Sequence, residues 1–381
     1  MLNNSRFDRR KTQDLITELI AQGLVQAHVN GCLGLITLNR PQALNALSLP
    51  MVRDITALLD AWRKDPTIQA VVLVGAAREG RPAFCAGGDI RFFHQAALAQ
   101  DPQLGEFFTE EYQLDHLIHT YPKPCIALMD GVVMGGGMGL AQGCKLRVVT
   151  ESSRLAMPET GIGLFPDVGG GWFLAQCPGH VGEWLALTGE VVQAGDGIEM
   201  GLADVFVPAA EWPAMLEALR TAEQPNAEHV VATVMEHAAV APDALHMPEL
   251  GTIDRHFGQA SIAAIAASLG ADASPWAQAQ LALLHKRSPL MMAVTLEQIR
   301  RARSLSLAED LRMERDMVHH CFHLRPGAAS ETVEGIRALA VDKDHAPRWN
   351  PVHIADVTPT MVEAFFASPW SAAAHPLATL R

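Results

Sequence analysis

The sequence predicts an α/β protein with a core over residues 26–210 and a mostly helical C-terminal region over residues 211–370. Two observations lead to this prediction. Short apolar runs typical of strands alternate with helical segments as far as about residue 210, whereas residues 212–322 have helical periodicity and no convincing strand. With 381 residues, of which 49% are hydrophobic, the chain is long enough to bury a large core. We expect residues 1–25 to form an N-terminal helical extension.

The elements of the core can be predicted in chain order. Two alternating apolar runs surround Asn30-Gly31, which is a strong signal for a β-hairpin. Ser48 is a suitable N-cap for an amphipathic helix whose apolar residues recur at helical spacing from Met51 to Trp62. Three further apolar runs predict buried strands at 68–74, 125–129 and 146–149. The run at 338–341 is compatible with a further strand or with simple packing.

Composition restricts the partners and the compartment. The formal net charge of −13 argues against nucleic acid, because neutralising phosphates needs a basic face. No apolar stretch is long enough for a transmembrane helix, so no membrane partner is expected. The first 23 residues lack the apolar region of a secretory signal, and the six cysteines include no C-x-x-C pair. We therefore expect reduced thiols in a cytoplasmic protein.

Two glycine-rich loops, residues 84–90 and 130–140, each follow an apolar run. Glycine lets the backbone approach a ligand closely, and the N–H groups at the start of a following helix face negative charge. One N–H group from each loop could therefore bind the same developing oxyanion. Tight turns in a compact sheet are the competing interpretation of either loop taken alone.

A third segment, residues 157–171, places two carboxylates in an apolar stretch rich in glycine and proline. Glu159 and Asp167 lie eight residues apart there. Acids in such surroundings either make structural hydrogen bonds or have shifted pKa values and take part in acid–base chemistry. The segment by itself favours neither interpretation. No metal site is expected, since the adjacent His319 and His320 would point about a hundred degrees apart on a helix.

Together these motifs resemble the enoyl-CoA hydratase/isomerase (crotonase) superfamily. The similarity is carried by F-C-A-G-G-D-I, by G-x-x-M-G-G-G and by M-P-E-x-x-I-G-L-F-P-D-x-G-G, and it begins at N-R-P-x-A-L-N-A-L over residues 39–47. The resemblance implies a crotonase-like spiral of ββα repeats. It also implies a small-molecule acyl-CoA substrate, no cofactor besides the coenzyme A of that substrate, and a homo-oligomer, since assemblies of trimers are common in the family.

Two positions resemble one branch of that superfamily. Simple hydratases carry one glutamate three residues after the middle glycine of the G-G-G loop and another in the Q-P-E segment. This chain has Gly139 at the first position and keeps only Glu159. It also has Asp167 where hydratases usually have glycine, and Glu111 lies upstream. This combination resembles the 3-hydroxyisobutyryl-CoA hydrolase branch.

That resemblance implies a role for each of five residues. The backbone N–H groups of Ala86 and Gly136 would form the oxyanion hole. Glu159 would be the catalytic carboxylate, either attacking the thioester or activating water. Asp167 would bind or polarise the 3-hydroxyl group of the acyl chain, and Glu111 would contact the same end of the substrate. The competing interpretation of Glu111 is a solvated acid on a helix face.

The leading hypothesis is hydrolysis of a short 3-hydroxyacyl-CoA, in particular 3-hydroxyisobutyryl-CoA as in valine catabolism. The first alternative is an enoyl-CoA hydratase or isomerase in which Asp167 supplies the second carboxylate. The second alternative is a CoA-binding protein that has kept the fold and lost the chemistry, because a fold alone does not prove an activity.

Overall fold

Two β-sheets form the core of the protein. The computed structural model describes residues 23–221 and 226–381, so the predicted N-terminal extension falls almost entirely outside the described residues. A six-stranded sheet has the order β1-β2-β3-β5-β7-β9, and a three-stranded sheet has the order β4-β6-β8. The strands are β1 (Val25–Asn30), β2 (Leu33–Leu38), β3 (Ala70–Gly75), β4 (Ala83–Cys85), β5 (Cys125–Met129), β6 (Val132–Met134), β7 (Leu146–Val149), β8 (Arg154–Ala156) and β9 (Val205–Phe206).

From β3 on, successive strands alternate between the two sheets, and helices follow the strand pairs. The pair β3 and β4 is followed by α3 (Ile90–Ala99) and α4 (Gln103–His119), and the pair β5 and β6 is followed by α5 (Gly136–Gln142). The small sheet is parallel throughout, and the large sheet is parallel from β2 to β9. This arrangement is a spiral of ββα repeats, which confirms the predicted fold class.

The hairpin and the first amphipathic helix form where the sequence predicts them. Strands β1 and β2 pair antiparallel, and Gly31 supplies the positive φ (+62°) that the tight turn needs. Helix α2 (Leu49–Arg63) follows Ser48, whose backbone is extended as at an N-cap although its hydroxyl makes no capping bond. Trp62 lies against Gly34 so closely that a Cβ atom there would collide with the indole ring.

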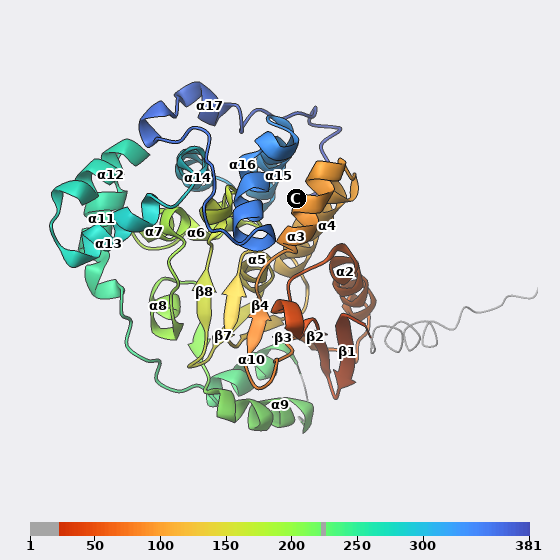
Figure 1. Cartoon of the computed structure of the whole chain (residues 1–381). Helices are drawn as coiled ribbons and strands as arrows, with labels where there is room; N and C mark the ends of the chain where they lie inside the picture. The colour runs from red at the N-terminus through yellow and green to blue at the C-terminus, as the bar shows by residue number, and fades with distance from the viewer. Residues whose placement is uncertain (1–22, 222–225) are drawn as a thin grey trace, which may run out of the picture.

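After β9, the described chain forms helices and connecting segments and no further strand. Helix α14 packs against α6 and α7, α15 against α4, and α16 against α3, so this region covers one end of the spiral (Figure 1). Helices α9 and α10 instead cover a face of the large sheet. In the part of the chain that the structure describes, no helix combines the length and apolar character needed to cross a bilayer. The helices not yet bounded are α6 (Gly170–Leu174), α7 (Val181–Thr188), α8 (Ala194–Glu199), α9 (Trp212–Thr221), α10 (Ala227–Glu236), α11 (Leu250–Phe257), α12 (Ile262–Ala271), α13 (Pro275–Leu284), α14 (Pro289–Ala302), α15 (Leu307–His323), α16 (Glu331–Ile336) and α17 (Pro359–Glu363).

Residues 338–341 form a helical turn and not a strand. The chain passes directly from α16 into a π-helical segment, Arg337–Val341. Ala338 is buried, whereas Leu339 and Val341 are partly exposed. Because the segment continues a helix, its backbone groups are not available for pairing with a sheet. Of the two alternatives for this run, the strand is wrong, and the packing interpretation holds for Ala338.

Candidate active site

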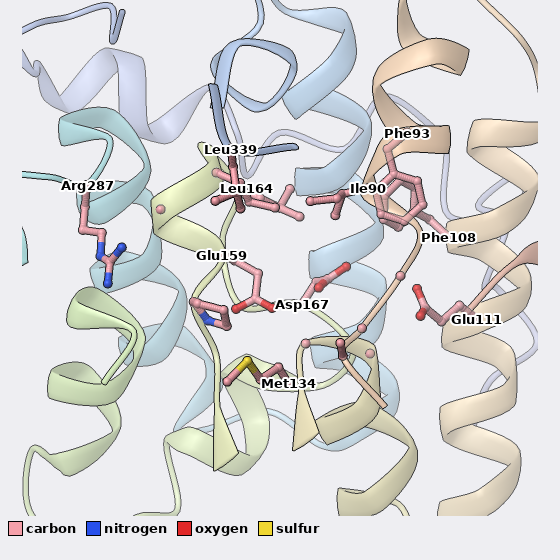
Figure 2. A pocket seen from close by; sticks show the side chains of 18 residues that line it. Ile90, Phe93, Phe108, Glu111, Met134, Glu159, Leu164, Asp167, Arg287 and Leu339 are labelled. Atoms are coloured by element: carbon pink, nitrogen blue, oxygen red, sulfur yellow. The ribbon is translucent and has the colours of Figure 1, made fainter. Parts of the chain in front are cut away.

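A cavity of about 360 Å³ is lined by residues from the spiral and from the helical region (Figure 2). All five residues predicted for the site line this cavity, and the remaining lining residues are mainly glycine or apolar, among them Phe93, Phe108 and Leu164. The predicted residues are Ala86, Glu111, Gly136, Glu159 and Asp167. Their roles stay predictions, but the structure brings the residues to one place.

The small sheet explains why three separate motifs meet at this cavity. Its strands β4, β6 and β8 are parallel and end at Cys85, Met134 and Ala156. The carboxyl ends of parallel strands lie at the same edge of a sheet, and ligands commonly bind in the crevice beyond that edge. The two glycine-rich loops and the segment that carries Glu159 directly follow these three strand ends.

The backbone N–H group predicted for Ala86 is not available for an oxyanion hole. It donates to the carbonyl oxygen of Leu44 at 3.0 Å. Leu47 forms a single parallel bridge with Gly88, which uses the backbone groups on either side of Gly88 and leaves the Gly88 N–H free. Within the described residues, neither Gly88 nor Gly136 has an acceptor for its N–H group. We therefore assign Gly88, in place of Ala86, as the partner of Gly136.

Two acids lie against the second glycine-rich loop. A Cβ atom on Gly135 would lie 2.9 Å from Oε1 of Glu159, and a Cβ atom on Gly136 would lie 2.5 Å from Oε1 of Glu111. Both distances are shorter than van der Waals contact, and Gly135 also has a positive φ of +50°. Glycine at these two positions lets a carboxyl group approach the loop from each side.

Glu159 is a buried acid with an unpaired oxygen. It follows β8, at the start of the short 3-10 helix Glu159–Ile162, and its Oε2 atom has no hydrogen-bond partner. Burial raises the pKa of Glu159 well above its usual value of 4.5, and the nearby charge of Asp167 raises it further. In Figure 2 its carboxyl group lies centrally among the lining side chains, where it can meet a bound ligand.

Asp167 lies close to Glu159 and is oriented by a tyrosine. The hydroxyl group of Tyr112 donates to Oδ2 of Asp167 at 2.8 Å. Burial raises the pKa of Asp167 to about 6, and the hydrogen bond from Tyr112 partly opposes this shift. Asp167 is therefore mostly ionised at neutral pH. No role was predicted for Tyr112 from the sequence, although it directly follows Glu111.

Glu111 and Asp115 lie one turn apart on α4 and share one face of the helix. Both are about 2% exposed, and Oε1 of Glu111 and both oxygens of Asp115 lack a hydrogen-bond partner. Burial raises the pKa of both acids well above their usual values, and the charge of Asp167 raises them further. Glu111 is thus a cavity acid, and the solvated interpretation is wrong. Asp115 was missed, although its spacing of four residues from Glu111 is a usable signal.

The helical region holds the loop that follows Asp167. On α15, Glu314 accepts hydrogen bonds from the N–H groups of Gly169 at 2.7 Å and Gly171 at 2.9 Å. Asp310, one turn earlier, accepts from the N–H group of Trp172 at 2.9 Å. Both acids are fully buried, but neither lines the cavity. They position the loop, and sequence reasoning could not connect them to it because they lie about 140 residues further along the chain.

Arg287 is the basic side chain among the described residues that line the cavity. Its Nε atom donates to the carbonyl oxygen of Thr188 at 2.9 Å, and it makes no ion pair with a carboxylate of the described chain. In Figure 2 it lies on the opposite side of Glu159 from Glu111. No group of three or more His, Cys, Asp or Glu side chains in residues 23–221 and 226–381 is arranged to hold a metal ion.

Comparison with known proteins identifies close relatives over most of the chain. The mitochondrial 3-hydroxyisobutyryl-CoA hydrolase of Xenopus tropicalis is 40% identical over 344 residues, which cover 89% of this chain and 87% of the relative. The protein of the same name from Bos taurus is 36% identical over 378 residues, 96% of this chain and 95% of the relative.

Two solved structures share the fold at similar identity. A carnitinyl-CoA dehydratase from Mycobacterium thermoresistibile is 39% identical, with a TM-score of 0.82 over 90% of this chain and 96% of the other. An enoyl-CoA hydratase from Rhodobacter sphaeroides 2.4.1 is 38% identical, with a TM-score of 0.82 over 91% of this chain and 98% of the other. Over most of its length the chain therefore has the architecture of these two enzymes.

The predicted cytoplasmic location is wrong, because the hydrolases to which the chain is similar are named as mitochondrial. The prediction depended on the cysteines, and all six are indeed buried and free. Free thiols are informative about oxidation and say nothing about which reducing compartment holds the protein.

The family assignment agrees with the fold and with the motifs around the cavity. The family model described as enoyl-CoA hydratase/isomerase matches residues 33–366. This match includes the three strand ends of the small sheet, both glycine-rich loops and the helices that support the site. The chain belongs to the enoyl-CoA hydratase/isomerase family.

Proposed function

We propose that the protein is an acyl-CoA thioester hydrolase that converts 3-hydroxyisobutyryl-CoA to 3-hydroxyisobutyrate and CoA. The observation that carries this proposal is that Glu159 lines the same mostly apolar cavity as Gly88 and Gly136, whose N–H groups are unpaired. The relatives named as hydrolases of this substrate, at 36–40% identity, support the choice of acyl group. The reaction belongs to valine catabolism and needs only water besides the CoA substrate.

The two N–H groups would act on the carbonyl oxygen of the thioester. They would donate to this oxygen as it gains negative charge in the transition state. Gly136 opens α5, so no carbonyl group of the same helix accepts its N–H. Losing one such donor typically costs about 3 kcal/mol of transition-state stabilisation.

Glu159 would make the new bond possible by one of two routes. As a nucleophile, its carboxylate attacks the thioester carbon, the C–S bond breaks, CoA leaves as a thiolate that takes up a proton, and water then hydrolyses the mixed anhydride. As a general base, it takes a proton from water while that water attacks the same carbon. A single turnover in H₂¹⁸O separates the two routes, because only the anhydride route can place ¹⁸O in the Glu159 carboxylate.

Asp167 and Glu111 would bind the 3-hydroxyl group of the acyl chain. Asp167, with a pKa of about 6, is mostly ionised at neutral pH and would accept a hydrogen bond from the hydroxyl group. Glu111 lines the same cavity and would contact the same hydroxyl group through its carboxyl group. A cavity of about 360 Å³ is small for a ligand pocket, which favours a short acyl group.

Release of free thiol from (S)-3-hydroxyisobutyryl-CoA tests the proposal. We expect rapid release by the wild-type protein and a loss of roughly 10²- to 10⁴-fold in Glu159→Gln, the usual range for removing a positioned acid–base group. Glu110→Gln is the matched control, because Glu110 is a neighbour of Glu111 that faces outward and pairs with Arg53. No release by the wild type, or an unchanged rate in Glu159→Gln, would contradict the proposal. The homo-oligomer stays a prediction that light scattering of the same sample tests.

A second candidate function is hydration of a short enoyl-CoA. The observation in its favour is that Asp167 lies close to Glu159 and could supply the second carboxylate, and the two similar solved structures are described as a dehydratase and a hydratase. Rapid loss of the enoyl absorbance of crotonyl-CoA, without thiol release, would support this candidate. CoA binding without turnover of any acyl-CoA would leave only the non-catalytic alternative.

A further inference from the structure

Phe108 forms a wall between two cavities. It lines the cavity of about 360 Å³ that holds the candidate active site, and it also lines a second cavity of about 240 Å³. The second cavity lies between α3, α4 and α15, and its other lining residues include Ala96, Leu104, Val318 and Phe322. Among the described residues, Phe108 alone lines both cavities.

Other aromatic rings hold the ring of Phe108 in place. Its centroid lies 4.9 Å from that of Phe93, which lines the first cavity, and 5.8 Å from that of Phe322, which lines the second. The centroids of Phe107 and Tyr112 lie 5.5 Å and 6.2 Å away. Phe108 is only 2% exposed, so its ring cannot turn aside without displacing these neighbours. The wall between the cavities is therefore rigid.

Phe108 also lies beside a group that would bind the acyl chain. Phe108 and Glu111 are three residues apart on α4, which places them on the same face of the helix, and Figure 2 shows both on the same side of Glu159. Under the proposed function, the acyl chain runs from Glu159 toward Glu111, where its 3-hydroxyl group is bound. In a longer 3-hydroxyacyl chain, the additional carbons are attached to the carbon that carries this hydroxyl group. They would therefore continue toward the ring of Phe108.

We propose that Phe108 limits the length of the acyl chain that the site accepts, and that the second cavity is a closed extension of the acyl site. This inference rests on the proposed hydrolase function. With the ring in place, the acyl site ends beside Glu111, and a longer chain has no space. Without the ring, the two cavities would become one continuous space, and the second cavity would hold the tail of a longer 3-hydroxyacyl-CoA.

The lining of the second cavity suits an alkyl tail. Alanine, proline, leucine, valine and phenylalanine make up most of it, and its two charged side chains, Arg315 and Asp101, already have partners. Arg315 donates from Nε to the hydroxyl group of Thr109 at 2.9 Å and lies 4.8 Å from the ring centroid of Trp370. Asp101 accepts from the N–H group of Gln103 at 2.9 Å. An alkyl tail would therefore not have to leave a free charge without its solvent.

The role of Phe108 is tested by thiol release from 3-hydroxybutyryl-CoA, 3-hydroxyhexanoyl-CoA and 3-hydroxyoctanoyl-CoA, comparing the wild type with Phe108→Ala. We expect kcat/KM of the wild type to fall at least roughly tenfold from the butyryl to the octanoyl substrate. In Phe108→Ala, the ratio of octanoyl to butyryl kcat/KM should rise at least roughly tenfold, because each methylene group buried in apolar space improves binding roughly fourfold. The ratio cancels any general loss of activity caused by repacking around Tyr112.

Phe257→Ala is the matched control for this comparison. Phe257 is a fully buried phenylalanine of α11 that lines neither cavity, so its replacement removes the same ring from the core elsewhere. We expect this variant to keep the chain-length ratio of the wild type.

The role of the second cavity is tested by adding Ala97→Leu to Phe108→Ala. Ala97, on α3, lines the second cavity and not the first. A leucine side chain there would occupy part of the space that the tail needs, so the double variant should lose most of the gain with the octanoyl substrate. A gain that survives in full would overturn the assignment of the second cavity.

Three results would overturn the role of Phe108. One is a wild-type protein that hydrolyses the octanoyl substrate as well as the butyryl substrate, and another is a folded Phe108→Ala protein with the ratio of the wild type. The third is a rise of the same size in Phe257→Ala. If Phe108→Ala does not fold, Phe108→Leu replaces it with the hexanoyl substrate, and an unchanged ratio again overturns the proposal.

Failure of the proposed function is seen separately, as absence of thiol release from 3-hydroxyisobutyryl-CoA by the wild type. In that case the Kd values of the same three CoA esters, measured by calorimetry, replace kcat/KM in each ratio. A rise in the relative affinity for the octanoyl ester in Phe108→Ala would support the role of Phe108, and an unchanged relative affinity would overturn it.

Discussion

Replacing Asp167 by asparagine should stabilise the folded protein at pH 8 while removing its activity. Burial raises the pKa of Asp167 from the usual 3.8 to about 6, even though the hydrogen bond from Tyr112 lowers it. At pH 8 the side chain is ionised in both the folded and the unfolded protein, so folding must bury a charge. Asparagine keeps the size of the side chain and can still accept from Tyr112, but it has no charge to bury.

The size of the effect follows from the pKa difference. The pKa of Asp167 is about 6 in the folded protein and 3.8 in the unfolded chain, a difference of about 2.2. Ionising Asp167 is therefore about 3 kcal/mol less favourable in the folded protein than in the unfolded chain. The raised folded pKa means that the charge penalty is absent below about pH 3.8 and grows as the pH rises to about 6. For a chain of 381 residues, 3 kcal/mol corresponds to a rise in Tm of about 4 °C, if unfolding is two-state.

Thermal unfolding measured by circular dichroism at pH 8 and pH 4.5 tests this prediction, with thiol release measured on the same samples. The gain in Tm should be present at pH 8 and mostly lost at pH 4.5. Asp60→Asn is the matched control, because Asp60 is an exposed acid on α2 and should change Tm little at either pH. A Tm at pH 8 that is unchanged or lower in Asp167→Asn, or a gain of the same size at both pH values, would refute the reasoning.

Two further predictions concern the residues that position Asp167. In Tyr112→Phe, the hydrogen bond that holds down the pKa of Asp167 is lost, so the acid limb of the pH–kcat profile should move up by roughly one to two pH units; an unmoved limb would contradict this role. In Glu314→Ala, the N–H groups of Gly169 and Gly171 lose their acceptor, and urea unfolding should show a loss of about 2–4 kcal/mol with a lower kcat. Glu314→Gln keeps one acceptor and should lose less, and equal losses in both variants would argue against the hydrogen bonds as the cause.

Local signals in the sequence were sufficient for much of the fold. The hairpin at Asn30-Gly31, helix α2 and strands β5 and β7 lie where they were predicted, because turn chemistry and hydrophobic periodicity act between residues close in the chain. The run at 338–341 could not be assigned in this way. Short apolar runs fit strands and helical turns equally, and contact with the preceding α16 decided in favour of a helical turn.

The identity of the main acids was also available from the sequence. Glu159 and Asp167 share one short segment, and the two glycine-rich loops could be recognised by composition and by resemblance. The parallel small sheet then brings these motifs to one cavity together with Glu111. Motifs of this kind are readable because each one depends on residues that are consecutive in the chain.

What only the tertiary structure decided depends on contacts between segments far apart in the sequence. Gly88 is chosen over Ala86 because the N–H group of Ala86 already donates to the carbonyl oxygen of Leu44. No pattern within the motif shows which of its N–H groups is used in this way. The role of Tyr112 in orienting Asp167 likewise needs two segments to meet. Val168 lies against Gly139 only because α5 passes beside the loop that follows Asp167. The sequence by itself determined which groups this protein has for chemistry, and close packing of distant segments determined which atoms of those groups are free to act.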